Sequence, residues 1–303
     1  MYYKHSGRFS LGGLLIAAAV GCAGSLILAY VYAWGLPLIP EVHLAGLATV
    51  AFGGLAGVSI GYGQIWGKVR NSAVGIALAT AISTLALYVS WAAWVPFVLD
   101  SQHVEHHISW IKLAQHPAAL WNLICIINQD GTWSTSSSGS PTNGLELWGI
   151  WAVEAVSVIG MAIFAEIGVL NHRPFCESCE RWCTRGAKML LAPPANVTQL
   201  KLQLEANDFK ALENLGTGNK ATSHLIVVLD NCEQCRQFYS MSLTHVLIGR
   251  TKLGKPTVSN KTIVQHLLID AGKAETLRQL SEKVVQAAKI AAPQSSTAAA
   301  GKK

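Results

Sequence analysis

The chain has 303 residues, a formal net charge of +6, 51% hydrophobic residues and 13% charged residues. Soluble domains carry about twice that share of charge, so the composition excludes an ordinary soluble protein. The deficit is concentrated in the first 170 residues, where three stretches lack Asp, Glu, Lys and Arg altogether: 9–40, 42–67 and 71–99.

Four apolar stretches are long enough to cross a membrane as helices. They cover residues 10–36, 42–66, 72–99 and 147–170. A hydrocarbon core about 30 Å thick needs roughly 20 helical residues, which every stretch provides. The first stretch is much longer than the apolar core of a signal peptide, so we interpret it as a retained span. We therefore expect residues 1–170 to form an all-α four-helix transmembrane bundle with one sizeable outer loop, 100–146.

The distribution of Lys and Arg predicts the orientation of these spans. Basic residues precede the first span, occupy the turn between the second and third, and follow the fourth: Lys4, Arg8, Lys68, Arg70, Arg173, Arg181, Arg185 and Lys188. The outer loop has a single basic residue, Lys112. Because positively charged loops stay in the cytoplasm, we expect both termini to be cytoplasmic and the protein to lie in a bacterial inner membrane.

Small residues follow one face of the second span. Gly53, Gly57 and Gly61 are spaced one helical turn apart, and glycines at this spacing let helix backbones approach closely. We interpret the stripe as a packing surface inside the bundle. The alternative is the seam of a homo-oligomer.

Two acids, Glu154 and Glu166, interrupt the fourth span. Ionisable groups inside a membrane usually face the bundle interior and find a polar partner. We expect Glu166 to reach the inner interface, near Arg70 or Arg173. Glu154 is the better functional candidate, either as a residue that fixes helix packing or as a proton or ion site.

The outer loop contains a helical pattern and a histidine cluster. The segment "PAALWNLICIIN", residues 117–128, predicts an amphipathic helix that lies on the bilayer or caps the bundle. The segment "HVEHH" places three histidines on one helical face: His103, His106 and His107. They are either an outer metal site or a solvated, interfacial cluster.

Residues 171–303 have a different composition, with 18 Lys and Arg against 10 Asp and Glu. We expect residues 171–291 to form a cytoplasmic α/β domain and the low-complexity tail, 292–303, to be disordered. Apolar runs predict strands, and capped or periodic segments predict helices. The predicted strands are 224–230 and 237–249, and the predicted helices are 207–215, 260–271 and 274–291. The segment 197–204 fits a helix or a strand equally well.

Four cysteines form two Cys-x-x-Cys pairs, Cys176 with Cys179 and Cys232 with Cys235. Disulfides do not persist in a reducing compartment, so such pairs favour metal or redox chemistry there. Two Cys-x-x-Cys turns complete a tetrahedral shell of four thiolates around zinc. Redox-active thiols and an iron–sulfur cluster are the alternatives. Cys183 is a spare thiol, either a substitute ligand or a buried core residue.

The segments "FCESCERW" and "NCEQCRQF" resemble the knuckles of zinc-ribbon proteins. The resemblance covers roughly 70 residues and leaves the spans untouched. It implies a structural zinc ion in a small zinc-ribbon-like domain. The 52 residues between the two pairs exceed the usual spacing, so a helical insertion must be accommodated.

The function predicted from these features is non-catalytic. A closed four-thiolate shell leaves no metal position for substrate, and the sequence lacks a phosphate-binding loop, a dinucleotide fingerprint and a nucleophile elbow. We expect an accessory, assembly or regulatory subunit that presents the domain to a protein partner. The alternatives are a membrane thiol–disulfide oxidoreductase that uses the cysteine pairs and a transporter component that uses Glu154. We do not expect nucleic-acid binding, because no basic strip is interleaved with aromatic residues.

Overall fold

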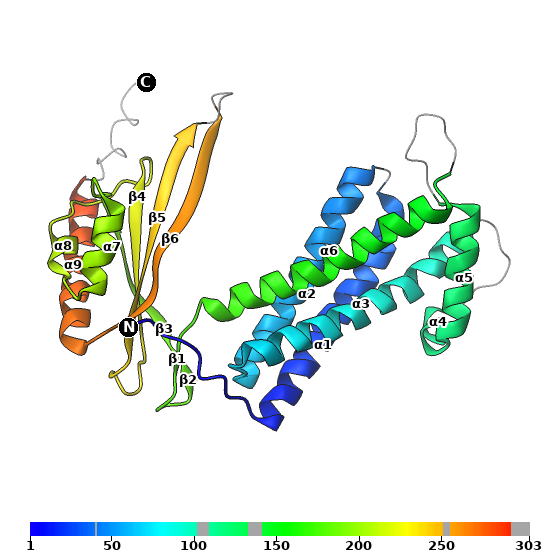
Figure 1. Cartoon of the computed structure of the whole chain (residues 1–303), viewed down its shortest axis with the longest axis horizontal. Coiled ribbons are helices and arrows are strands. Elements are labelled where there is room, and N and C mark those ends of the chain that lie inside the picture. Colours follow the sequence, from blue (N-terminus) through cyan, green and yellow to red (C-terminus); the bar gives the residue numbers. More distant parts are fainter. Residues whose placement is uncertain (40, 102–108, 133–140, 251–254, 292–303) are drawn as a thin grey trace, which may run out of the picture. The chain divides into compact units, whose positions relative to one another are not determined.

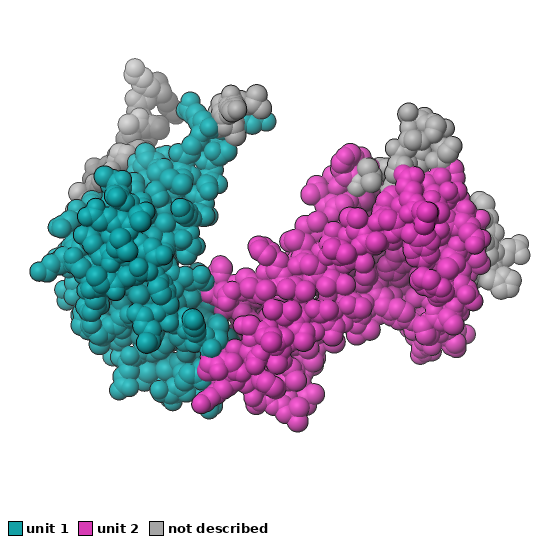
Figure 2. All heavy atoms as spheres, viewed as in Figure 1, with its two compact units in different colours: residues 1–5, 173–303 teal, residues 6–172 magenta. Residues whose placement is uncertain are grey.

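The computed structural model describes residues 1–39, 41–101, 109–132, 141–250 and 255–291 (Figure 1). The chain divides into two compact units, Ser6–His172 and a second unit that joins Met1–His5 to Arg173–Lys303 (Figure 2). The division after residue 172 lies close to the boundary expected from the sequence. The first five residues, however, belong to the C-terminal unit.

Four long apolar helices build the unit Ser6–His172: α1 (Leu11–Gly35), α2 (Val42–Gly67), α3 (Ser72–Ser101) and α6 (Gly144–Asn171). Their length and composition suffice for crossing a membrane. The four long apolar helices predicted from the sequence are therefore confirmed. Ser10 caps α1 by accepting a hydrogen bond from the Gly13 backbone N–H at 3.0 Å. A short 3₁₀ turn, Leu36–Leu38, follows α1.

Two shorter helices, α4 (Trp110–Gln115) and α5 (Pro117–Asp130), connect α3 to α6. The predicted helix at 117–128 is confirmed as α5, and Pro117 occupies its first turn. Its apolar stripe is buried against residues of α3 and α6: Leu120, Ile124 and Ile127 pack with Ala92, Val95, Leu147 and Trp151. Within this unit, α5 therefore packs onto the ends of α3 and α6.

The second unit contains a four-stranded antiparallel sheet with strand order β3-β4-β5-β6. The strands are β3 (Thr184–Leu191), β4 (His224–Asn231), β5 (Tyr239–Arg250) and β6 (Pro256–Ile269). Three helices, α7 (Val197–Glu205), α8 (Lys210–Glu213) and α9 (Ala271–Ala291), lie on one face of the sheet (Figure 1). Alternate strand residues and the facing helix residues form the hydrophobic core, among them Met189, Leu225, Met241, Leu204 and Leu277.

The predicted strands 224–230 and 237–249 are confirmed as β4 and β5, and the predicted helix 274–291 is confirmed within α9. The ambiguous segment 197–204 is helical, as α7. The helix expected at 207–215 is shorter, because only α8 is helical there. The insertion between the two cysteine pairs is not purely helical, since it contains β3 and β4 as well as α7 and α8.

The helix predicted at 260–271 is wrong, because this segment belongs to strand β6. A bulge explains the error. His266 has a φ of 50° and the register with β5 shifts, so the residues that face the core are Val264, Leu267 and Ile269. An extra residue in a strand breaks its two-residue alternation. The resulting spacing of three imitates one face of a helix.

The first residues of the chain extend the sheet along β6. The Tyr3 backbone N–H donates to the His266 carbonyl at 2.9 Å, and the Leu268 N–H donates to the Met1 carbonyl at 2.9 Å. The Tyr2 side chain donates to Glu205 of α7 at 2.6 Å. This pairing explains why the segment Met1–His5 is part of the C-terminal unit.

Candidate metal centre

The first cysteine pair lies in a small hairpin of two short strands. Strand β1 (Phe175–Cys176) pairs with β2 (Arg181–Trp182), and a tight turn between them carries Cys179. The Cys183 N–H donates to the Pro174 carbonyl at 2.9 Å and closes the base of the hairpin. Glu180, directly after the second cysteine, has a φ of 50°. This left-handed conformation is uncommon for a residue other than glycine.

The second pair occupies the turn between β4 and β5, as predicted. The Arg236 N–H donates to the Cys232 carbonyl at 3.0 Å, and the Cys232 N–H donates to the Phe238 carbonyl at 3.1 Å. Arg236 also follows the second cysteine of its pair, and its φ is 52°. The two Cys-x-x-Cys loops therefore share a left-handed backbone conformation at the residue after the second cysteine.

The fold brings the two loops together. The sulfur atoms of Cys176, Cys179, Cys232 and Cys235 all lie within 4.8 Å of one another, and Cys176 Sγ is 3.7 Å from Cys235 Sγ. A tetrahedral zinc ion about 2.3 Å from each sulfur would hold the sulfurs about 3.8 Å apart. The arrangement therefore suits one metal ion. All four are free cysteines, without disulfides.

Burial and hydrogen bonds shift the pKa values of three of these cysteines. Burial raises the pKa of Cys176, and raises that of Cys179 to about 12. A hydrogen bond from the Gln237 backbone N–H lowers the pKa of Cys235 to about 6. The Cys235 thiolate is thus stabilised by the backbone, while Cys176 and Cys179 favour the protonated form. A bound divalent cation would favour the thiolate form of all four cysteines, because metal binding displaces thiol protons.

Cys183 is adjacent to the four-cysteine group but is not a member of it. Its side chain is buried and packs with Cys176 and Cys232. Burial raises the pKa of Cys183, and the neighbouring thiols and Asp230 raise it further. The structure therefore places Cys183 as a protonated thiol beside the four others.

The N-terminal segment supports the first hairpin. The Tyr3 hydroxyl accepts a hydrogen bond from the Phe175 N–H at 3.0 Å, and the Tyr3 ring meets the edge of Phe238 with a centroid distance of 5.5 Å. Phe175 in turn packs against Trp182 at 5.1 Å. Sequence reasoning missed this role of Tyr3, because a three-residue extended segment has no recognisable pattern.

A second polar group borders the centre and was also missed. His266 Nδ1 lies 3.4 Å from Asp230 Oδ2 and 3.3 Å from Ser242 Oγ. A nucleophilic triad needs the acid and the serine on opposite ring nitrogens, so this geometry does not fit one. Arg185 Nε lies 3.9 Å from the other oxygen of Asp230. These residues are far apart in sequence, and no motif links them.

The two acids of α6 have different surroundings. Glu154 Oε1 accepts a hydrogen bond from the Tyr32 hydroxyl at 2.7 Å, and that hydroxyl is 2.8 Å from Thr49 Oγ1. Glu166 is buried within the bundle, with 1% of its surface exposed. Neither of its carboxylate oxygens has a hydrogen-bond partner among the described residues. Its polar neighbour is Gln64 of α2.

The glycine stripe of α2 lies against α6. A Cβ atom on Gly53 would be 2.5 Å from the Val158 carbonyl oxygen, and one on Gly57 would be 2.1 Å from the Ala162 carbonyl oxygen. A Cβ atom on Gly61 would meet Val169 at 2.8 Å. The predicted outer metal residues His103, His106 and His107 lie outside the described part of the chain.

The chain matches no protein-family model, and no curated protein or solved structure is significantly similar to it. The four cysteines and their geometry are therefore the basis for assigning a function.

Proposed function

We propose that the protein is a four-span membrane protein that presents a zinc-stabilised, non-catalytic interaction domain in the cytoplasm, as an accessory, assembly or regulatory subunit. The observation that carries the proposal is the convergence of four cysteine sulfurs within 4.8 Å. Two separate Cys-x-x-Cys loops, each followed by a residue in the left-handed conformation, supply these sulfurs.

Zinc is the metal that this donor set favours. Four thiolates in tetrahedral geometry suit zinc or an iron–sulfur cluster. A cluster places several atoms between its thiolates, whereas a single ion lets all four sulfurs approach closely. The separation of 3.7 Å between Cys176 and Cys235 supports a single ion. The closed shell would hold the hairpin β1–β2 onto the turn between β4 and β5.

The C-terminal unit contains chain segments from both ends of the helix bundle, and this supports an even number of membrane crossings. Residues before α1 and residues after α6 hydrogen-bond to each other within this one unit. Both flanks of the bundle must therefore lie on the same side of any membrane that the bundle spans. The basic residues of these flanks favour the cytoplasmic side.

A membrane thiol–disulfide oxidoreductase is the second candidate, and Cys235 is the observation that favours it. Its lowered pKa is typical of a nucleophilic thiol. Two facts weigh against this candidate. Cys176 and Cys232 are only 2% and 3% exposed, so a partner disulfide has poor access to them. All four sulfurs also converge on one point, whereas a redox site needs a single pair.

Metal analysis of the purified full-length protein separates the two candidates. We expect one zinc ion per chain, and we expect Cys232→Ser to lose the zinc and to expose the C-terminal unit to limited proteolysis. The matched control is Cys125→Ser, which removes a thiol from α5 and should retain the zinc. A metal-free, protease-resistant wild type with reversibly oxidised thiols would instead identify an oxidoreductase. Iron in place of zinc would refute the zinc assignment.

Reporter fusions test the membrane topology. Fusions after Trp66 and Leu215 should report the cytoplasmic side, and a fusion after Ile127 should report the outer side. An externally active reporter after Leu215 would overturn both the orientation and the argument for a reducing environment. The interaction role is tested by purifying the protein from its native membranes. A partner that accompanies the wild type and the Cys125→Ser variant, and is lost in Cys232→Ser, supports it.

A further inference from the structure

The sheet of the C-terminal unit has a second face that none of the described helices of that unit covers (Figure 1). Strand residues that point away from the core emerge there. Among them are Leu190, Ile226, Val246 and Ile248, from three adjacent strands. A solvated face of an antiparallel sheet usually carries polar side chains at such positions. The apolar strip is therefore a feature that the fold alone does not require.

This strip forms the floor of a groove. The groove has a volume of about 450 Å³, and Val258 of β6 completes its apolar lining. Ligand pockets in proteins usually enclose about 300–1,000 Å³ and are mostly apolar, with a few polar groups that orient the ligand. The volume of this groove falls within that range and its lining is mostly apolar, although the groove is open to solvent.

Two of the three polar side chains that line the groove are lysines, which favour an anion. Lys188 lies on β3, Lys220 on the loop before β4, and His224 at the start of β4. None of the described residues that line the groove is acidic. Neither lysine takes part in an ion pair among the described residues. The lysines therefore offer two ammonium groups that the fold does not neutralise.

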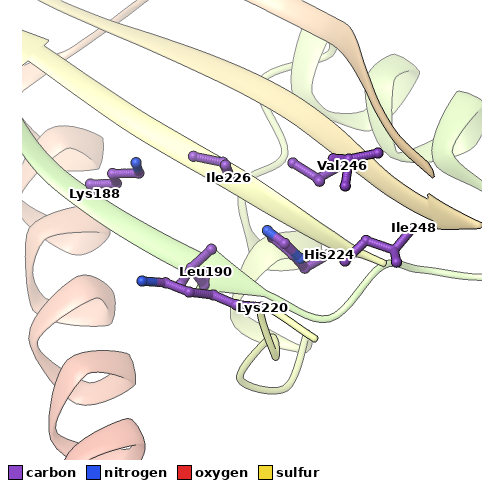
Figure 3. Close-up of a pocket in the computed structure, with 8 residues that line it drawn as sticks. Lys188, Leu190, Lys220, His224, Ile226, Val246 and Ile248 are labelled. Atoms are coloured by element: carbon purple, nitrogen blue, oxygen red, sulfur yellow. The ribbon is translucent and has the colours of Figure 1, made fainter. Parts of the chain in front are cut away.

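The two lysines lie at one end of the groove, beside Leu190 (Figure 3). Figure 3 shows the ammonium groups of Lys188 and Lys220 on one side and the side chains of Val246 and Ile248 on the other. His224 lies between them (Figure 3). Its Nδ1 donates to the Thr222 carbonyl at 2.7 Å, so Nε2 of the neutral ring is a hydrogen-bond acceptor, and the lysines are the groups that attract an anion.

We propose that this groove binds an anionic amphiphile, a molecule with a carboxylate or phosphate head and an alkyl chain. The head would lie between Lys188 and Lys220, where charge-assisted hydrogen bonds to oxygen anions are strong. The chain would lie over Ile226, Val246 and Ile248. A fatty acid and an anionic phospholipid share this chemistry. The inference is independent of the proposed zinc ion, because none of the cysteines lines the groove.

The test is a titration of the full-length protein in nanodiscs of neutral lipid, with isotope-labelled Ile, Leu and Val methyl groups observed by NMR. Decanoate and decyl phosphate supply the two head groups, and decanol supplies the same chain without charge. The double variant Lys188→Ala/Lys220→Ala removes the ammonium groups. The matched control, Lys210→Ala/Lys283→Ala, removes the same charge from α8 and α9 on the helical side.

We expect decanoate and decyl phosphate to shift the methyl signals of Ile226, Val246 and Ile248. The Lys188/Lys220 variant should bind at least about tenfold more weakly, and the Lys210/Lys283 control should match the wild type. Nanodiscs that contain phosphatidylglycerol identify the source of the ligand. If phosphatidylglycerol shifts the same methyl signals and prevents decanoate from binding in the groove, the natural occupant is a membrane lipid.

Several outcomes would overturn the inference. Equal binding of decanol and decanoate, or equal binding by the two lysine variants, would show that charge does not contribute. Signals that stay unmoved by every anionic amphiphile, but shift with an acidic apolar peptide, would show that the groove recognises protein instead. Limited proteolysis of each variant checks that the sheet is intact, so that a loss of binding reports on the groove itself.

Discussion

The close contact between α2 and α6 predicts a large difference between two neighbouring Gly→Ala substitutions. A Cβ atom on Gly57 would lie 2.1 Å from the Ala162 carbonyl oxygen, whereas ordinary contact begins at 3.4 Å. The helices must therefore separate by about 1.3 Å, and such overpacking typically destabilises by about 1–3 kcal/mol. A Cβ atom on Gly54 would meet nothing within 4 Å.

The matched pair isolates the effect of the clash. Both substitutions gain about 1 kcal/mol of helix propensity, so the difference between them reports on packing alone. We expect Gly57→Ala to be less stable than Gly54→Ala by about 1–3 kcal/mol. The measurement is unfolding of the full-length protein in mild detergent by titrated dodecyl sulfate, followed by circular dichroism.

Two results would refute this reasoning. Equal stability of the two variants would mean that α2 and α6 do not meet at Gly57. If Gly57→Ala instead converted a dimer to a monomer with unchanged protomer stability, the stripe would be the seam of a homo-oligomer. Size-exclusion chromatography with light scattering distinguishes the second result from the first.

Three further predictions concern single side chains. Tyr3→Phe removes the hydrogen bond to Phe175 and should destabilise the C-terminal unit by about 0.5–1.5 kcal/mol, measured by chemical denaturation; an unchanged midpoint would contradict the role of Tyr3. Cys183→Ala should keep one zinc ion per chain by metal analysis, and loss of zinc would make Cys183 a ligand. Glu166→Gln should raise the stability of the bundle by about 1 kcal/mol or more, because it replaces a buried ionisable carboxyl group by a neutral amide of the same shape; a lower thermal midpoint would show that the carboxyl group has a stabilising partner.

Acid should also release the metal. Metal-bound thiolates have pKa values far below those of free thiols, so their contribution to stability is present at neutral pH and is lost as the pH falls through the bound-state values. We expect zinc release and unfolding of the C-terminal unit to coincide in an acid titration. An excess of a strong chelator at neutral pH should produce the same unfolded state. Full retention of structure after complete metal removal would show that the cysteine shell does not stabilise the unit.

The parts of the fold that follow from local patterns could be predicted from the sequence. The long apolar stretches predicted α1, α2, α3 and α6, and the β-branched run at 224–230 predicted β4. The two Cys-x-x-Cys spacings identified the four residues that the structure brings together. In each case a run of adjacent or regularly spaced residues carried the information.

The features that sequence reasoning missed depend on long-range contacts or on one irregular residue. The bulge at His266 gave β6 a helical spacing, and no neighbouring residue reveals the bulge. Likewise, the groove is lined by residues that lie up to 70 positions apart in the chain. Its two lysines are each unremarkable in sequence, because only the sheet brings them together.

The pairing of residues 1–3 with β6 affects the order in which the protein can be assembled. The Tyr3 backbone bonds to His266, which is synthesised about 260 residues later. At 5–20 residues per second, the N-terminal segment would wait roughly 13–50 s for its partner strand. During that interval all four apolar helices are made. The edge of β6 can therefore be covered only after the bundle has been synthesised, so a chain that stops before β6 leaves its first residues without a place to pair.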